Sequence, residues 1–368
     1  MQAYFELKDI TARSCEFVDA FQGKLEELIK TEGLYPGVGI AVIANLNFHN
    51  QDIPSILFNR LDFSKHFENP EDPVVLGEIM KRINIKDNKI NIDRTIRENV
   101  GEFILQYNFI RGFRPKREAR KTEMPLDLPF NKDKFNYADE RECDPEVFDS
   151  QKYSDTLSVD FLFNRYPFAP YHFLWVPNRK TGKHNQFIDP EKDSEILEAA
   201  WNLVTQEGYG KGLWVCYNSN GAHASVNHFH LQGFFLTKDW QPPIEQVFEE
   251  HDGSSSLKHY LKNAKWISLS DGVNGLKENI KEVNERYKKG EKMAYHFCMT
   301  PEGTAFFPRK HQGDDNYFAL LQKANFTTGL AFFEMLFEII SPTAEISLFK
   351  KEETYKNILA LYYAASLD

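Results

Sequence analysis

The sequence predicts an α+β protein whose antiparallel sheet carries flanking helices. Strand-like runs and helical periods alternate between residues 172 and 236, in the order strand, helix, strand, turn, strand. No glycine-rich strand-to-helix turn precedes them, which disfavours a doubly wound dinucleotide-binding fold. With 368 residues, of which 42% are hydrophobic, the chain has enough apolar material for a large core.

The first hundred residues begin with a predicted amphipathic helix. Residues 16–32 place apolar side chains on one helical face, and the period stops at Gly33, a frequent residue at helix C-termini. The apolar runs 38–43 and 56–58 are typical of strands, whereas the charged stretch 63–100 has no clear period. This helix is expected to pack rather than to react.

Regular elements are easier to assign in the middle of the chain. Residues 159–163 and 172–176 predict two strands, and the prolines between them enforce a loop. Residues 194–206 predict a helix with an apolar inner face, which leads through two glycines into a strand at 213–217. The segment that carries reactive side chains follows at once.

The C-terminal part shows a similar alternation. An amphipathic helix is predicted around residues 276–287, and it ends near Gly290. Residues 295–299 and 304–307 then predict a hairpin, because Pro301 is typical of the second position of a turn.

The segment that ends in His228-Phe229-His230-Leu231-Gln232 carries the chemistry. Side chains alternate along an extended chain, so His228, His230 and Gln232 would share one face of a strand. A neutral imidazole can attack phosphorus and hold a nucleotide as a phosphoramidate. His230 has His228 and Gln232 on either side of it and is therefore the predicted nucleophile.

Paired histidines allow two other interpretations. They are a common zinc-ligand pair on strands, and a strand histidine is often only structural. However, Gln232 is a poor zinc ligand, and no cysteine or carboxylate lies nearby at a familiar zinc spacing. Asn218 and Gly221 predict a turn whose backbone N–H groups can cradle phosphate, and Ser225 adds a hydroxyl. These residues together indicate an anion site that faces a nucleophile.

The stretch from Asn218 to Gln232 reads Asn-Ser-x-Gly-Ala-x-Ala-Ser-x-Asn-His-x-His-x-Gln. It resembles the active-site signature of the histidine-triad superfamily, in the galactose-1-phosphate uridylyltransferase-like branch. Within that branch it is most similar to the GDP-L-galactose and GDP-D-glucose phosphorylases. Further matches lie between residues 100 and 355, and the clearest are 103–108, 129–137 and 164–177.

The resemblance implies a histidine-triad-like sheet built from two related halves. We expect a catalytic half at residues 101–248 and a C-terminal half at residues 257–368, which completes the substrate pocket. The polar stretch 250–256 is the predicted linker. Residues 1–100 match nothing in the family, and we expect them to pack on the core.

A basic stretch, residues 111–121, stands out in an acidic chain. In the resembling family a basic segment lies between the counterparts of Gln106 and Phe135, which implies substrate contact for Arg111 or Arg114. Guanidinium groups bind phosphate oxygens in pairs, so a phosphate clamp is one interpretation. A solvated charged face is the other, and the sequence leaves both open.

Other candidates also follow from the resemblance. Asn164 lies where histidine-triad proteins place a polar residue that contacts ribose. The segment 135–137 is expected either to help hold the base or to pack in the core. His172, Arg309 and His311 are weaker candidates, for which a structural or solvated role is the simpler expectation.

The activity implied is nucleotidyl transfer through a nucleotidyl-His230 intermediate, in the form of phosphorolysis of a GDP-hexose to GDP and hexose 1-phosphate. Gln232 occupies the position of a third histidine in hydrolytic relatives and cannot supply a proton, which favours transfer over hydrolysis. A dinucleoside polyphosphate phosphorylase and a hexose-1-phosphate nucleotidylyltransferase remain as enzymatic alternatives. A metal-dependent hydrolase and a non-catalytic nucleotide-binding regulator remain as different classes.

Composition narrows the expected partners. The formal net charge of −10 disfavours general nucleic-acid binding, which needs a concentrated positive field. No apolar run reaches the ~20 residues that cross a bilayer, and the four scattered cysteines fit free thiols, so a cytoplasmic protein is expected. We expect a nucleotide sugar and inorganic phosphate as partners, no nucleic acid, no membrane and no cofactor, with a homodimer as an open alternative to a monomer.

Overall fold

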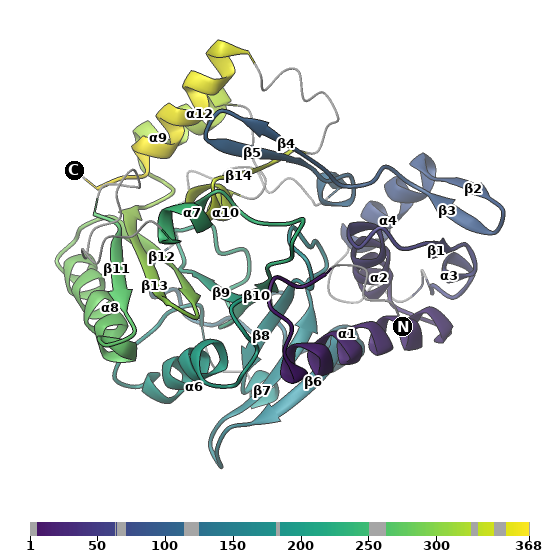
Figure 1. Cartoon of the computed structure of the whole chain (residues 1–368), viewed down its shortest axis with the longest axis horizontal. Helices are drawn as coiled ribbons and strands as arrows, with labels where there is room; N and C mark the ends of the chain where they lie inside the picture. Colours follow the sequence, from purple (N-terminus) through teal and green to yellow (C-terminus); the bar gives the residue numbers. More distant parts are fainter. Residues whose placement is uncertain are drawn as a thin grey trace.

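An eight-stranded antiparallel sheet forms the centre of the molecule (Figure 1). The computed structural model describes residues 6–62, 64, 71–113, 125–181, 185–249, 263–324, 330–341 and 351–367. The strand order is β11-β13-β12-β9-β10-β8-β7-β6. The predicted α+β class, with an antiparallel sheet and flanking helices, is confirmed.

The strands of this sheet are β6 (Val147–Lys152), β7 (Ser158–Phe163), β8 (Phe173–Pro177), β9 (Leu213–Asn218), β10 (Leu231–Phe235), β11 (Lys265–Ser268), β12 (Met293–Thr300) and β13 (Gly303–Lys310). The helices of the described chain are α1 (Ala12–Lys30), α2 (Pro36–Phe48), α3 (Ile56–Asn59), α4 (Glu71–Arg82), α5 (Glu140–Cys143), α6 (Ser194–Thr205), α7 (Ile244–Glu249), α8 (Gly272–Lys288), α9 (Asp315–Ala324), α10 (Leu330–Leu336) and α12 (Glu352–Ala364).

The two faces of the sheet pack against different helices. Tyr217 and Phe235 share a core with α1, α6 and α8. Their neighbours Cys216 and Phe234 point the other way and share a core with α7, α9, α10 and α12. This alternation is the period of two that a strand imposes on its side chains. We call the second face, that of Cys216 and Phe234, the α10 face.

The chain follows the same path twice through the sheet. In β8-α6-β9-β10, the third strand inserts between the other two, and the sheet order is β8-β10-β9. In β11-α8-β12-β13 the order is β11-β13-β12. The two units meet where β9 and β12 pair in antiparallel register. The expectation of two related halves in the fold therefore agrees with the topology. The exact boundaries stay a prediction, and the proposed linker at 250–256 lies outside the described residues.

The N-terminal region corrects two predictions. Residues 38–43 lie in helix α2 and residues 56–58 in α3, where strands were expected. Every residue of α2 is buried, so its apolar run carries no amphipathic signal that would distinguish a helix from a strand. By contrast, the amphipathic helix predicted at 16–32 is confirmed as α1, whose Thr11 and Ser14 form a capping box.

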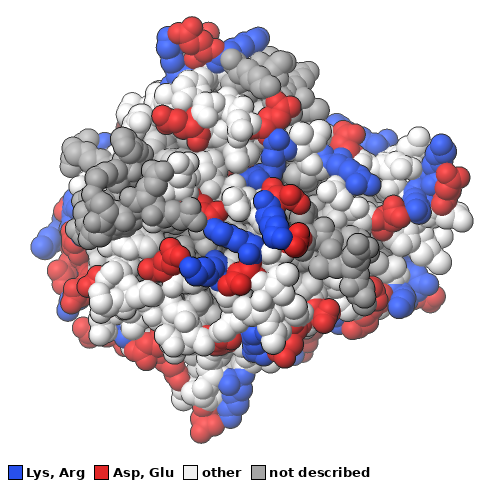
Figure 2. All heavy atoms as spheres, in the orientation of Figure 1, with Lys and Arg blue, Asp and Glu red and all other residues white. Residues whose placement is uncertain are grey.

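Two small sheets complete the fold. One consists of β1 (Ile53–Pro54), β2 (Asn84–Lys86) and β3 (Lys89–Asn91), and the other of β4 (Ile96–Val100), β5 (Phe103–Tyr107) and β14 (Glu338–Ser341). Strand β14 runs parallel to β5, so a C-terminal segment lies beside residues 103–107 (Figure 1). None of the described helices is long and apolar enough to cross a membrane. Lysine and arginine side chains lie among aspartate and glutamate on the face shown in Figure 2.

Candidate active site

The paired histidines lie just before strand β10, not on it. The strand begins at Leu231, so the prediction of a strand at His228 and His230 is wrong, although Gln232 does lie on β10. The segment is nevertheless extended enough to alternate. Phe229 stacks on Tyr217, on the face covered by α6 and α8, whereas the rings of both histidines contact Tyr137. The two imidazoles therefore share one side, as predicted.

One hydrogen bond sets the tautomer of His230. Its Nδ1 atom lies 2.8 Å from the carbonyl oxygen of His228, and a carbonyl oxygen only accepts. Nδ1 must therefore carry the proton, and Nε2 of the neutral ring presents its lone pair. The residue is buried, so bulk water has little access to this ring.

His228 has the opposite tautomer. The backbone N–H of Tyr137 donates to its Nδ1 atom at 3.0 Å, so the proton of the neutral ring lies on Nε2. Tyr137 is held in turn by Arg179, whose Nη1 donates to the Tyr137 carbonyl at 2.9 Å. The site therefore contains one imidazole that can attack and one that can donate.

Gln186 holds the backbone of His230, and sequence reasoning missed it. Its Oε1 accepts from the N–H of His230 at 2.9 Å, and its Nε2 donates to the carbonyls of His230 and Asn218 at 3.1 and 2.9 Å. The side chain thus links β9 to the chain that enters β10, at the level where His230 would lie opposite Asn218. Gln186 lies in a loop without periodicity, so no pattern singled it out.

Asn227 was also missed as a structural residue, although the signature contains it. Its Oδ1 accepts from the N–H of Gln186 at 2.9 Å. Its Nδ2 donates to the carbonyls of Leu128 and Pro129 at 3.1 and 2.9 Å. This side chain therefore ties the histidine segment to the chain that brings in Tyr137.

Gln232 belongs to a polar cluster with His172 and Asn164. Nε2 of His172 lies 3.2 Å from Oε1 of Gln232, and the N–H of Phe168 donates to Nδ1 at 3.3 Å. Burial, with the nearby Arg111 charge, holds the pKa of His172 well below its usual value, so the ring is neutral with its proton on Nε2. Because Oε1 of Gln232 accepts a hydrogen bond from this N–H, the amide hydrogens of Gln232 are left to donate elsewhere.

Asn164 contacts the same amide. Its Nδ2 atom lies 3.4 Å from Oε1 of Gln232, and its carbonyl accepts from Asn45 of α2 at 3.0 Å. The structure thus brings Asn164 to the site, while the ribose contact stays a prediction. His172, which was expected to be structural or solvated, is fully buried against Gln232.

Asn218 ends strand β9, and a turn with Gly221 at its third position follows at residues 219–222. The N–H of Ala222 donates to the Ser219 carbonyl at 3.0 Å, and Gly221 has φ of 77°, the backbone of a type II turn. A Cβ atom on Gly221 would lie 2.2 Å from the ring of His311, so this position needs glycine for space as well. Ser225 is half-buried in the segment that follows.

Arg111 lies close to this cluster but is already engaged. It is buried and donates through Nη1 to the carbonyl of Tyr166, and its guanidinium lies 5.7 Å from the ring centre of Phe168. The interpretation as a solvated face is therefore wrong for Arg111. Arg114, the other candidate, lies outside the described residues.

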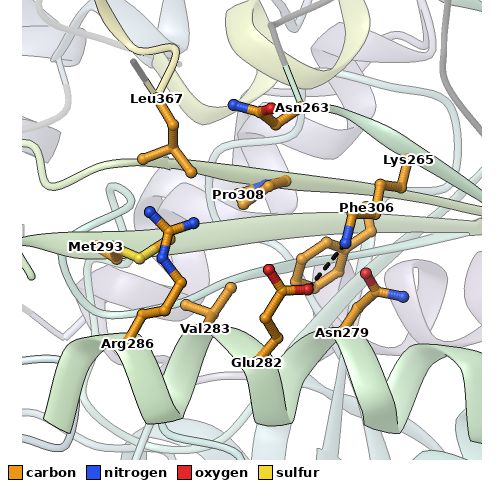
Figure 3. A pocket seen from close by; sticks show the side chains of 10 residues that line it. All are labelled: Asn263, Lys265, Asn279, Glu282, Val283, Arg286, Met293, Phe306, Pro308 and Leu367. Atoms are coloured by element: carbon orange, nitrogen blue, oxygen red, sulfur yellow. Dashed lines mark hydrogen bonds and ion pairs between the residues drawn. The ribbon is translucent and has the colours of Figure 1, made fainter. Parts of the chain in front are cut away.

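A pocket between α8 and strands β11–β13 lies apart from the motif (Figure 3). Its charged side chains are paired, Lys265 with Glu282 at 2.9 Å and Arg286 with Glu291 at 2.6 Å. No residue of the histidine signature lines it. Over the described part of the chain, no group of three or more His, Cys, Asp or Glu side chains could hold a metal ion.

Comparison with known structures finds yeast Ap4A phosphorylase Apa2. Its complex with Ap4A aligns over 79% of this chain and 94% of that one, at 12% identity and a TM-score of 0.48. Its complex with AMP aligns over 74% and 88%, at 13% identity and a TM-score of 0.45. No curated protein matches the sequence.

A family model described as "GDPGP1-like, N-terminal domain" matches residues 93–234. The matched range contains Asn164, the Asn218 turn, both histidines and Gln232. It ends inside β10, before the second of the two units begins. The segment that holds the paired histidines is therefore similar to a GDPGP1-like N-terminal domain.

Proposed function

We propose that this protein transfers a nucleotidyl group through a covalent bond to His230, and that its reaction is the phosphorolysis of a GDP-hexose. The tautomer of His230 carries the proposal, because the carbonyl of His228 holds the proton on Nδ1 and leaves Nε2 as a buried nucleophile. The match to a GDPGP1-like domain and the similarity of the motif to GDP-hexose phosphorylases support guanine as the base.

In the first displacement, Nε2 of His230 attacks the α-phosphorus. The bond from that phosphorus to the bridging oxygen breaks, and hexose 1-phosphate leaves with the electron pair. The ring becomes a phosphoramidate that carries positive charge, which the His228 carbonyl stabilises by accepting from Nδ1. The turn at Asn218 and Gly221, with Ser225, stabilises the negative charge on the phosphoryl oxygens.

In the second displacement, an oxygen of inorganic phosphate attacks the same phosphorus. The P–N bond breaks, GDP leaves, and His230 regains its lone pair. Gln232 donates its amide hydrogens to a phosphoryl oxygen, since His172 occupies its Oε1 atom. Neither step needs a strong general acid, because a sugar phosphate is a good leaving group. Arg111, Arg114 and Asn164 are proposed substrate contacts, and no metal or cofactor enters this scheme.

The test is a substrate panel. The protein with GDP-glucose or GDP-L-galactose plus phosphate should yield GDP and hexose 1-phosphate. Without phosphate, intact-protein mass spectrometry should show one added GMP, and His230→Ala should show none. UDP-sugars, ADP-sugars and diadenosine tetraphosphate test the base and the leaving group, and hexose 1-phosphate in place of phosphate tests nucleotidyl exchange.

Three outcomes would contradict the proposal. Absence of turnover and of adduct across the panel would leave the nucleotide-binding regulator as the better reading. Activity that disappears on chelation would favour a zinc hydrolase that uses His228 and His230 as ligands. An adduct that persists in His230→Ala would move the nucleophile elsewhere.

A further inference from the structure

Four polar side chains converge behind the phosphate turn, on the α10 face of the sheet. His296 of β12, Arg309 of β13, Tyr317 of α9 and Glu334 of α10 are each completely buried. All four lie beyond residue 234, where the family match ends. The two displacements described above use none of them. A completely buried ionic cluster is costly to desolvate, so its arrangement calls for a physical reason.

Glu334 is the centre of this cluster. Its carboxylate lies 2.7 and 3.0 Å from Nε and Nη2 of Arg309, and it accepts from Tyr317 at 2.5 Å. Nε2 of His296 lies 3.0 Å away. Burial opposes ionisation, but the charge of Arg309 and the hydrogen bonds from His223 and His296 outweigh it and hold the pKa of Glu334 well below its usual value. The carboxylate is thus charged and nearly saturated with donors.

Two of its partners reach the turn. Arg309 uses its remaining Nη1 atom to donate to the carbonyl of Gly221 at 3.0 Å. Nδ1 of His296 lies 2.9 Å from the side-chain oxygen Oδ1 of Asn218. Asn218 and His296 are directly opposite each other on β9 and β12. The cluster therefore contacts this loop at Asn218 and Gly221, the two positions proposed to bind the phosphate.

The contact with His296 sets how the Asn218 amide is oriented. Nδ1 of His296 faces Oδ1 of Asn218, and an amide oxygen only accepts, so Nδ1 donates to it. The other ring nitrogen, Nε2, faces the Glu334 carboxylate. With Oδ1 of Asn218 turned toward His296, the Nδ2 amide hydrogens are the donors that Asn218 can offer to a phosphoryl oxygen.

We propose that Glu334, Arg309 and His296 are positioning residues, which hold the Asn218 amide and the Gly221 backbone in the geometry that the phosphoryl oxygens require during transfer. The second unit of the chain, which has no reactive loop, thereby orients the loop of the first. This inference rests on the proposed function for its rate measurement. Its structural measurement is independent of that function.

Two substitutions at His296 distinguish its contact with Asn218 from its contact with Glu334. His296→Asn places an amide near the former Nδ1 atom and retains the contact with Asn218. His296→Gln places its amide near the former Nε2 atom and retains the contact with Glu334 instead. Glu334→Gln removes the carboxylate at nearly constant shape. The matched controls are His49→Asn and His49→Gln, since His49 is buried and also has hydrogen bonds at both ring nitrogens.

Three quantities are measured on each full-length variant. They are the melting temperature, the amide hydrogen exchange of residues 218–223, and the single-turnover rate of nucleotidyl-enzyme formation with GDP-glucose. We expect His296→Gln and Glu334→Gln to speed exchange in this segment and to slow adduct formation by about a hundredfold, the usual effect of a small misplacement at a reacting centre. The KM should change much less than kcat. His296→Asn should keep most of the wild-type rate of adduct formation.

The inference is overturned if exchange in residues 218–223 is unchanged in His296→Gln and Glu334→Gln. It is also overturned if both His296 variants slow adduct formation only in proportion to their loss of stability, as the His49 controls do. If the wild-type protein forms no adduct with any nucleotide, the proposed function fails. The exchange measurement then decides by itself whether these residues hold the turn.

Discussion

Individual backbone anchors matter at this site as much as the reactive side chains. His230 has its own backbone N–H and carbonyl bound by a single residue, Gln186, which is completely buried. His230 lies on an irregular segment just before β10, where no strand ladder fixes its position. The side-chain amide of Gln186 replaces that ladder, with one acceptor and two donations.

Gln186→Ala should therefore weaken both stability and transfer. It leaves buried backbone groups of His230 and Asn218 without this partner, which costs roughly 1–3 kcal/mol of unfolding free energy. Adduct formation should slow by more than about tenfold, because the attacking atom loses its fixed position. Urea unfolding and single-turnover kinetics measure the two effects. Gln22→Ala, at a buried glutamine of α1, is the control, and an equal slowing in both variants would contradict this role.

At the scale of elements, a histidine at the end of helix α2 joins this helix to the chain that enters the main sheet. Nδ1 of His49 donates to the carbonyl of Asn45 at 2.8 Å, and its Nε2 accepts from the N–H of Tyr171 at 3.0 Å. Tyr171 precedes β8, so this ring connects the N-terminal region to the eight-stranded sheet. Burial lowers the pKa of His49 to about 4, because a charged ring would lose hydration and the Tyr171 bond.

This pKa predicts loss of stability in mild acid. Above pH 6.5 both the folded and the unfolded chain keep His49 neutral, and the group contributes no pH dependence. As the pH falls from 6.5 toward 4, only the unfolded chain takes up the proton, so the free energy of unfolding falls by about 1.4 kcal/mol per pH unit for this residue. The free energy of unfolding, measured with urea between pH 7 and pH 4.5, should fall less steeply with pH in His49→Gln than in the wild type. An equal dependence on pH in the two proteins would contradict the assignment.

The elements predicted correctly have a hydrophobic period or a turn residue that can be recognised in the sequence. The amphipathic helices α1, α6 and α8 and the hairpin of β12 and β13 were each marked by polar residues or a turn at their borders. Helix α2 failed because all its residues are buried and no polar face marks the helical period. The parallel pairing of β14 with β5 joins segments far apart in sequence, and no local pattern reports it.

The residues of the site also divide into those that the sequence predicted and those that it did not. The motif itself brought together His228, His230, Gln232 and the Asn218 turn, because they lie close in sequence. Contacts that cross the fold escaped prediction. Gln186 lies in an irregular loop, and Glu334 lies more than one hundred residues from the turn it supports. Long-range partners of this kind carry no short-range signature.

The whole molecule has two units of one topology but different connections. Residues 219–230 link β9 to β10 and carry the histidines, whereas only residues 301 and 302 link β12 to β13. A two-residue turn has no room for a phosphate cradle. The second unit thus lacks the chemical groups of the first, although it follows the same path.

We expect one nucleotidyl group per chain at saturation. Intact mass spectrometry with excess nucleotide sugar and no phosphate should show a single mass increment. His230→Ala should remove it completely, because the second unit offers no substitute nucleophile at the equivalent connection. A second increment, or a residual one in the variant, would contradict a single site.

The shared topology of the two units also has a consequence for how the sequence should vary among relatives. A unit without the histidine loop is free to vary in sequence, except where it contacts that loop. Among relatives, substitutions should therefore accumulate faster across β11, α8 and the turn at residues 301–302 than around Asn218. His296 and Arg309 should be the exceptions, because their side chains bond to Asn218 and Gly221.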